Sequence, residues 1–310
     1  MTDRAADTIS AIESRVATDI GRGSGELAPH TRGSLHQAAL TLTTVRPSHV
    51  VVLTGFYIPT ATPPLPETDG PLGAVQIASA VVALGGTARI LTDSLSAPAI
   101  ETVLRYAGLS LPVDIAPIPG EAGEKAYLEW EEELLATYTS PTSPVTCMVS
   151  VERAGPAADG NVYNMRAIDI SGYTAPLHRV FEHGPWTTIG IGDGGNEIGM
   201  GVLPAELVSQ HVRHGSTIHC RVGCESLIVA GTSNWGAAGL VAATQIVSAS
   251  RNSAVASLLD PNWSIGALTA LTSTRTAVDG VLQHPSPTVD GLDQERYTGI
   301  LAQLAELAQS

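Results

Sequence analysis

The chain has 310 residues, of which 44% are hydrophobic and 15% are charged, so it is long enough for one large domain or two small ones. This composition is typical of a globular protein and excludes a disordered chain. The net charge of −14 argues against nucleic acid and against an anionic membrane as partners, because both require a basic surface.

The N-terminal sequence and the few cysteines indicate the expected cellular compartment. The opening stretch, MTDRAADTISAIESRV, has early acidic residues and no apolar core, so we expect neither a secretory signal nor a transit peptide. No apolar run reaches the ~18 residues of a membrane span. Cys147, Cys220 and Cys224 are too sparse for a disulfide scaffold and are expected to be buried. We therefore expect a cytoplasmic protein, and a homo-oligomer is compatible with this composition.

Predicted strands and helices alternate through the first half of the chain. A helix is predicted at 7–20. Short β-branched runs predict strands at 49–56, 88–93 and 113–118. Helices are predicted at 72–86, 96–108 and 123–138, the second with Ser96 as its N-cap and Gly108 at its end. The proline-rich segment 57–71 is interpreted as an active-site loop.

The second half repeats this rhythm. Strands are predicted at 145–152, 186–193, 217–222 and 226–231, and helices at 234–250, 264–278 and 293–309. Such alternation predicts an α/β fold, with a mostly parallel sheet and helices on both faces in a Rossmann-like three-layer arrangement. Without a convincing linker, residues 1–310 are interpreted as one domain, with the N-terminal and C-terminal helices as decorations.

Polar loops follow four of the predicted strands. Their sequences are TGFYIPTATPPLPETDGPLG, ERAGPAADGNVYNMRAIDIS, GDGGNEIGMG and GTSNWG. In an open parallel sheet the carboxyl ends of the strands share one edge, and ligands bind there. We therefore expect these loops to gather around one site.

A dinucleotide site is one interpretation of the glycine-rich loop, because Gly190, Gly192 and Gly195 fit G-x-G-x-x-G. Against it, the first two glycines lie within the predicted strand, and no clear long helix follows. The expected acidic residue is also missing after 217–222. A nucleotide-dependent enzyme therefore remains an alternative with weak support.

A carboxylate site is the second interpretation. The loops contain five acids, two arginines and three asparagines, namely Glu67, Asp69, Asp159, Asp193, Glu197, Arg153, Arg166, Asn164, Asn196 and Asn234. Asp in a turn often only satisfies backbone N–H groups, which is the simpler explanation for any one of them. So many acids are more than turns require, and they predict a small, polar pocket.

Five stretches in order carry a family resemblance: TGFYIP, ETDGPLGA, VERAGPAADGNVYNMRAIDIS, GIGDGGNEIGMG and LIVAGTSNWGA. Together, from about residue 15 to 285, the chain resembles the C-terminal domain family of D-glutamate cyclase. The resemblance implies an amino-acid substrate and conversion of D-glutamate to 5-oxo-D-proline and water. The family's mitochondrial members carry a further N-terminal domain and a transit peptide, and we expect neither here.

Lactam formation requires a base for the amine, activation of the γ-carboxyl and a proton for the departing oxygen. The expected catalytic residues are Asp193, Glu197 and Asp69. The expected substrate-binding residues are Glu67, Arg153, Asn164, Arg166, Gly194, Gly195, Asn196, Ser233 and Asn234, with amides of the glycine loop facing the ligand.

Two questions stay open at this level. No cofactor is required by the sequence, but Asp69, Asp193 and Glu197 offer oxygen ligands suited to Mg²⁺ or Mn²⁺. The alternatives to a D-glutamate cyclase are a related cyclase or hydrolase of secondary metabolism acting on another small amino acid or amide, and a non-catalytic small-molecule binder.

Overall fold

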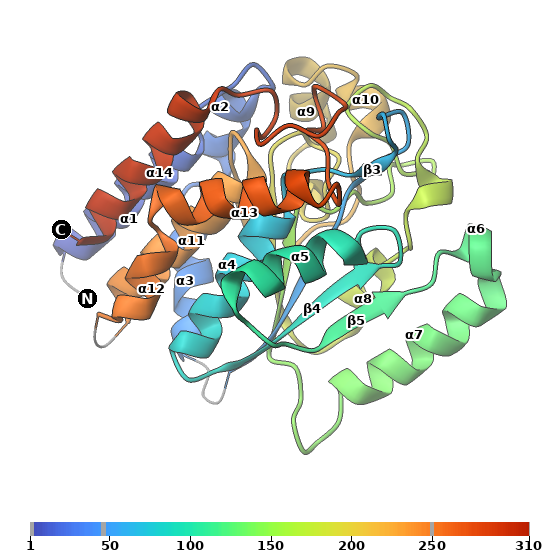
Figure 1. Cartoon of the computed structure of the whole chain (residues 1–310), viewed down its shortest axis with the longest axis horizontal. Coiled ribbons are helices and arrows are strands. Elements are labelled where there is room, and N and C mark those ends of the chain that lie inside the picture. The colour runs from blue at the N-terminus through green and yellow to red at the C-terminus, as the bar shows by residue number, and fades with distance from the viewer. Residues whose placement is uncertain (1–2, 45–47, 249–250, 310) are drawn as a thin grey trace.

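Six strands form one parallel sheet in the computed structural model, which describes residues 3–44, 48–248 and 251–309 (Figure 1). The strands are β1 (His49–Thr54), β4 (Thr87–Asp93), β5 (Val113–Ala116), β6 (Cys147–Val151), β7 (Thr187–Gly192) and β8 (Ser226–Val229). A separate antiparallel hairpin, β2 (Tyr57–Ile58) and β3 (Leu65–Pro66), lies within the proline-rich loop. The predicted parallel α/β sheet is confirmed.

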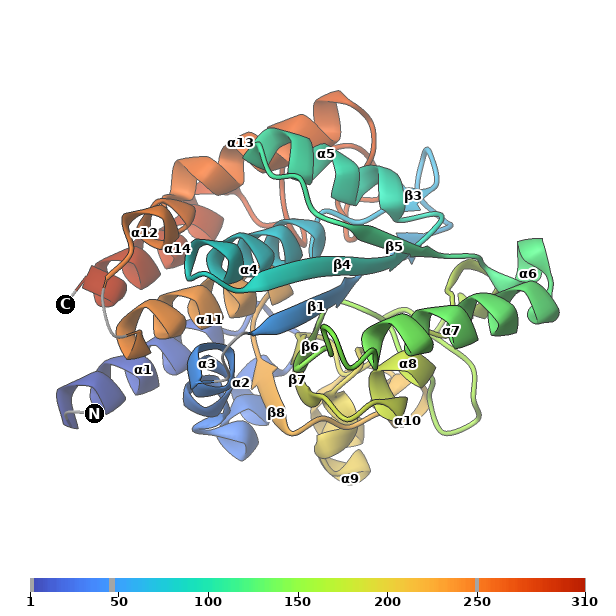
Figure 2. The same cartoon turned by 90° about the horizontal axis from the view of Figure 1, so that it is seen from below.

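Helices cover both faces of this sheet, which confirms the three-layer arrangement (Figure 2). One face carries α1 (Asp3–Val16), α3 (Ser34–Thr44), α4 (Pro71–Ala83), α5 (Ala97–Ala107), α11 (Ser233–Val247), α12 (Ser253–Leu258), α13 (Pro261–Ser273) and α14 (Gln294–Gln309). The other group comprises α2 (Ser24–Leu27), α6 (Pro119–Ala122), α7 (Glu124–Tyr138), α8 (His178–His183), α9 (Ala205–His211) and α10 (Gly215–Ile218). None of the helices in the described part of the chain has the length and apolarity needed to cross a membrane.

The strand order β5-β4-β1-β6-β7-β8 is that of a doubly wound sheet. The chain builds outward from β1 to β5, returns to place β6 beside β1, and then builds outward to β8. In such sheets the crevice at the carboxyl ends, where the direction reverses, is the usual ligand site. Here that point lies between β1 and β6.

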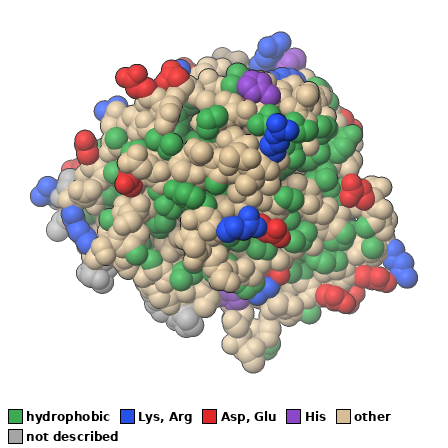
Figure 3. Space-filling view, viewed as in Figure 1, with side chains coloured by type: hydrophobic (Ala, Val, Ile, Leu, Met, Phe, Trp, Pro, Cys, Tyr) green, Lys and Arg blue, Asp and Glu red, His purple; other side chains and the backbone are tan. Residues whose placement is uncertain are grey.

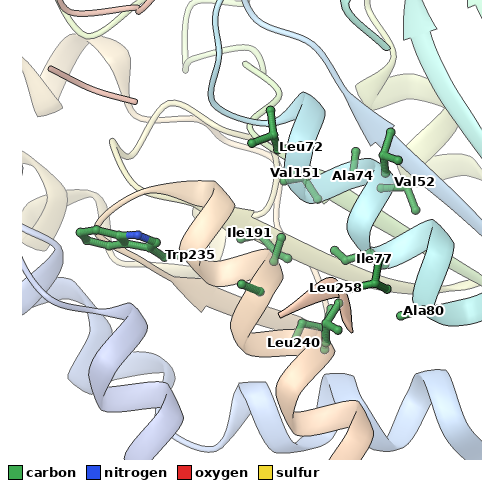
Figure 4. Close-up of a cluster of buried hydrophobic side chains, with 14 of the residues drawn as sticks. Val52, Leu72, Ala74, Ile77, Ala80, Val151, Ile191, Trp235, Leu240 and Leu258 are labelled. Carbon is green, nitrogen blue, oxygen red and sulfur yellow. The ribbon is translucent and has the colours of Figure 1, made fainter. Parts of the chain in front are cut away.

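The core between the sheet and one helical layer is built mainly by α4 and α11 (Figure 4). Trp235 and Leu240 of α11 and Ile77 of α4 are buried there with Val151 of β6 and Ile191 of β7. The terminal helices α1 and α14, expected as decorations, pack on each other and on α11 and add buried side chains to this core.

One predicted strand is wrong. Residues 217–222 partly belong to α10, and the rest is irregular. The alternation of buried and more exposed side chains that a strand would show is present, since Ile218, Cys220 and Val222 are all buried. The backbone, however, pairs with the glycine-rich loop: the Cys220 N–H donates to the Gly195 carbonyl at 2.9 Å, and the Val222 carbonyl accepts from Gly199. Helices α3 and α12 were not predicted.

The contact between α4 and α11 generates a stability test. A Cβ at Gly73 would lie 2.6 Å from the Cβ of Ala237, and neither atom can rotate away. We expect Gly73→Ala to lower the free energy of unfolding by about 1–3 kcal/mol, because the helices must separate. Chemical denaturation measures this change.

Gly299 of α14 is the matched control, because a Cβ there meets nothing within 4 Å. Gly299→Ala should raise stability by about 0.5–1 kcal/mol through helix propensity. Equal stabilisation by both substitutions would contradict the proposed close packing.

Candidate active site

Three buried carboxylates meet where the loops after β1, β6 and β7 converge. Asp69, Glu152 and Asp193 each offer an oxygen, and these oxygens all lie within 4.8 Å of one another. Asp69 follows the hairpin β2–β3, while Glu152 and Asp193 each come directly after their strand. The convergence of these loops at one sheet edge is what the strand order requires.

Asp69 is held by the N-terminus of α11. Its two oxygens accept hydrogen bonds from the backbone N–H groups of Ser233 at 2.8 Å and Asn234 at 2.7 Å. The Ser233 hydroxyl donates to Oε2 of Glu152 at 2.5 Å, and the Asn234 side chain accepts from the Gly70 N–H at 3.1 Å. Ser233 and Asn234, predicted to bind substrate, therefore position two of the three carboxylates.

Glu152 was missed by the sequence analysis. Its φ of 45° is unusual for a residue other than glycine, and such conformations cluster at functional sites. Glu152 ends the strand predicted at 145–152 and begins the polar loop after it, which was a usable signal, but only its neighbour Arg153 was predicted.

Arg22 and Asp290 were also missed. Nη1 of Arg22 lies 3.0 Å from both carboxylate oxygens of Asp193, and Nη2 donates to Asp290. Arg22 lies between α1 and α2, and Asp290 lies between α13 and α14. Neither residue follows a strand of the sheet, so no argument from the sheet edge could have found them.

The glycine-rich loop folds around Glu197 instead of a ligand. Oε1 of Glu197 accepts from the N–H groups of Asp193 at 3.1 Å and Gly194 at 2.7 Å. A Cβ at Gly192 would lie 2.9 Å from the Glu197 side chain, and Gly195 has a φ of 89°. These two amides therefore do not face a substrate, contrary to the expectation, and Glu197 shapes the loop that carries Asp193.

Arg153 also makes its hydrogen bonds outside the group of three carboxylates. Its guanidinium donates to Asp93 at 2.5 Å and to the carbonyl oxygens of Gly55 and Ala175 at 2.9 and 2.6 Å. Its side chain is buried, and it does not border the cavity described below, so the structure does not support a substrate-binding role. The Asn196 amide is likewise used, donating to the Tyr163 carbonyl at 2.7 Å.

A cavity of about 400 Å³ opens beside the three carboxylates. Its polar lining includes Glu67, Glu152, Asp290, Asn164, Arg22, Arg166 and Arg213, and its apolar lining includes Ile20, Phe56, Ile58, Met165 and Val281. Of the residues predicted to bind substrate, Glu67, Asn164 and Arg166 thus border the cavity. Asp69 and Asp193 do not border it themselves, but they adjoin it through Glu152.

Burial shifts the acidity of these groups. It raises the pKa of Asp69 to about 8, and nearby Asp290 adds to the rise, while the amides of Asn234 and Ser233 oppose it. Burial and neighbouring carboxylates hold the pKa values of Glu67 and Glu152 well above their usual range. Burial also raises the pKa of Asp193, although the Arg22 guanidinium opposes that rise.

We call Glu67, Asp69, Glu152, Asp193 and Asp290 the acid cluster. Arg22 is the one cation that pairs with it among the described residues. Figure 3 shows scattered acidic side chains on the face of the molecule that it draws, whereas the five members of the acid cluster are buried. Five buried carboxylates with one guanidinium cannot all remain charged at low cost, so the site favours protons, a metal cation or a substrate ammonium.

Comparison with known proteins identifies the family of this chain. Residues 12–305 match the family described as D-glutamate cyclase-like, C-terminal. The chain belongs to this family. It is 34% identical over 253 residues to the human protein named D-glutamate cyclase, mitochondrial, an alignment covering 78% of this chain and 39% of the human protein. The resemblance read from the five motifs is thereby confirmed for the D-glutamate cyclase-like family.

The raised pKa values predict a pH-dependent stability. A carboxyl whose pKa is higher in the folded than in the unfolded state binds its proton more tightly in the native protein. Its contribution to stability is therefore greatest at low pH and falls as the pH rises from the unfolded-state pKa to the folded-state pKa. In EDTA, we expect Tm to fall by at least about 5 °C between about pH 5 and pH 8.5. Differential scanning fluorimetry at a series of pH values measures this change in Tm.

Glu152→Gln should flatten this dependence, because it removes one of the coupled acids. Glu306→Gln, at an exposed position of α14, should leave it unchanged. A wild-type Tm that is constant or rises over this range, or an identical slope in Glu152→Gln, would contradict the coupling.

Proposed function

We propose that this chain forms a lactam from a glutamate-like amino acid, converting D-glutamate to 5-oxo-D-proline and water. The supporting observation is the acid cluster at the carboxyl edge of a doubly wound sheet, beside a cavity that also presents arginines. The name of the human relative points to the same substrate. Because the chain spans about 39% of that protein's length, the activity remains our proposal for this chain.

The acid cluster suits the reacting end of the substrate. A substrate ammonium entering the cavity meets Glu67, Glu152 and Asp290, and it supplies positive charge that this buried region lacks. Curling the chain to bring the amine to the γ-carboxyl then supplies much of the rate, since closure of a five-membered ring depends on positioning.

We assign proton transfer to Glu67. It borders the cavity, and its carboxylate lies against Gly280, where any side chain would collide with it. Because its pKa is raised well above the usual range, its carboxylate, once ionised, is basic enough to take a proton from the ammonium. The resulting carboxylic acid returns that proton to the departing oxygen, and a second proton from the nitrogen follows the same route. The C–O bond then breaks, and the oxygen leaves as water.

We also propose that Asp69, Glu152 and Asp193 hold Mg²⁺ or Mn²⁺. Three buried carboxylates are a donor set that such hard cations prefer, and one oxygen of each lies within 4.8 Å of the others. A cation there would supply Lewis-acid activation of the γ-carboxyl. Ser233 and the N-terminus of α11 keep the ligands oriented.

The test is turnover of D-glutamate, L-glutamate and 5-oxoproline, followed by chromatography with and without Mg²⁺ or Mn²⁺. We expect interconversion of D-glutamate and 5-oxoproline, and a fall in kcat of at least about 100-fold in Glu67→Gln. Glu306→Gln serves as the matched control and should retain full activity.

Two results would overturn this proposal. One is the absence of any turnover of the three compounds by folded wild-type protein at every cation condition. The other is full activity in Glu67→Gln, which would remove the proton-transfer group from the mechanism.

A further inference from the structure

Arg213 lines the cavity, and its guanidinium has no partner among the described residues. It lies in the loop between α9 and α10, is exposed to solvent and borders the cavity together with Arg166. Across residues 3–44, 48–248 and 251–309, no hydrogen bond or ion pair engages its guanidinium. The sequence analysis did not single it out, because it follows a helix rather than a strand.

The backbone at Arg213 is nevertheless fixed. Val212 before it is buried and packs towards Gly195 of the glycine-rich loop. His214 after it has a φ of 59°, and its carbonyl accepts from the N–H of Thr217 at 2.8 Å. The loop therefore presents Arg213 from a defined position that is tied to the loop carrying Asp193.

The other two cations of the cavity are already engaged. Arg22 bonds Asp193 and Asp290. Arg166 donates to the carbonyl oxygens of Gly280 at 3.4 Å and Val281 at 3.2 Å, which leaves its charge without a carboxylate partner. Arg213 has no partner for any of its donors in the part of the chain that the structure describes, so it is the strongest site for an anionic group in this cavity.

The cavity thus presents both acids and two arginines that have no carboxylate partner among the described residues. Arg166 and Arg213 attract a carboxylate, whereas Glu67, Glu152 and Asp290 favour the ammonium. In lactam formation the amine and the γ-carboxyl must meet at the acid cluster. The α-carboxylate takes no part in bond formation, so it is free to face the arginines.

We propose that Arg213, assisted by Arg166, binds the α-carboxylate of the substrate, so that the site prefers amino acids that carry one. This assignment rests on the proposed function for the orientation of the substrate. Two compounds test the contribution of the α-carboxylate alone. D-glutamate and 4-aminobutyrate have the same spacing between the amine and the γ-carboxyl, and they differ only in the α-carboxylate. Cyclisation of either forms one C–N bond and releases one water, so neither needs a co-reactant.

The experiment measures Kd by isothermal titration calorimetry and, separately, KM and kcat for both compounds. In Arg213→Met we expect Kd and KM for D-glutamate to rise about 10- to 100-fold with little change in kcat. Values for 4-aminobutyrate should change less than about twofold, because the lost partner is absent from it. Arg166→Met should act in the same direction with a smaller effect.

Arg32→Met is the matched control, since Arg32 is exposed in a separate groove beside Thr187 and Ser226, at the amino ends of β7 and β8. Equal losses for both compounds in Arg213→Met, or an unchanged Kd for D-glutamate, would overturn the assignment, as would failure of the wild type to bind D-glutamate. Binding that depends on Arg213 without any turnover would uphold the assignment and reject the proposed reaction.

Discussion

The attachment of Asp69 to the first two amides of α11 is the contact on which the site depends. It links the loop after β1 to the helix after β8, two segments 164 residues apart in sequence. The Ser233 hydroxyl extends the link to Glu152, and Asp193 lies within 4.8 Å of both carboxylates. A helix N-terminus favours negative charge, so the fold itself supplies a place where a carboxylate can be buried.

This arrangement leaves the acid cluster short of positive charge. Arg22 pairs with Asp193 and Asp290, while burial raises the pKa values of Glu67, Asp69 and Glu152. Raised pKa values at a cavity are typical of groups that exchange protons or bind cations. The same imbalance supports the proposed amino-acid substrate, whose ammonium would lower the cost of the buried charge while its carboxylate would face the arginines of the cavity.

The parallel sheet and the gathering of loops at one edge followed from strand–helix alternation, because connection rules leave few topologies. Asp69 and Asp193 were found because acids in loops after strands meet there. Arg22 and Asp290 come from helix–helix connections, whose positions depend on how α1 and α14 pack on α11. The amides of Asp193 and Gly194 do not face a ligand as expected, because a sequence cannot tell whether the group approaching a glycine-rich backbone is a ligand or the chain's own Glu197 side chain.

The most direct measurement of the central claim is the number of protons released when Mn²⁺ binds. Calorimetric titration near pH 7 in two buffers of different ionisation enthalpy gives that number. Because the acid cluster holds protons that a cation displaces, we predict one Mn²⁺ per chain with release of at least about one proton, and at least about tenfold weaker binding in Glu152→Gln. No Mn²⁺ binding, or binding with no proton release and no dependence on Glu152, would contradict the account.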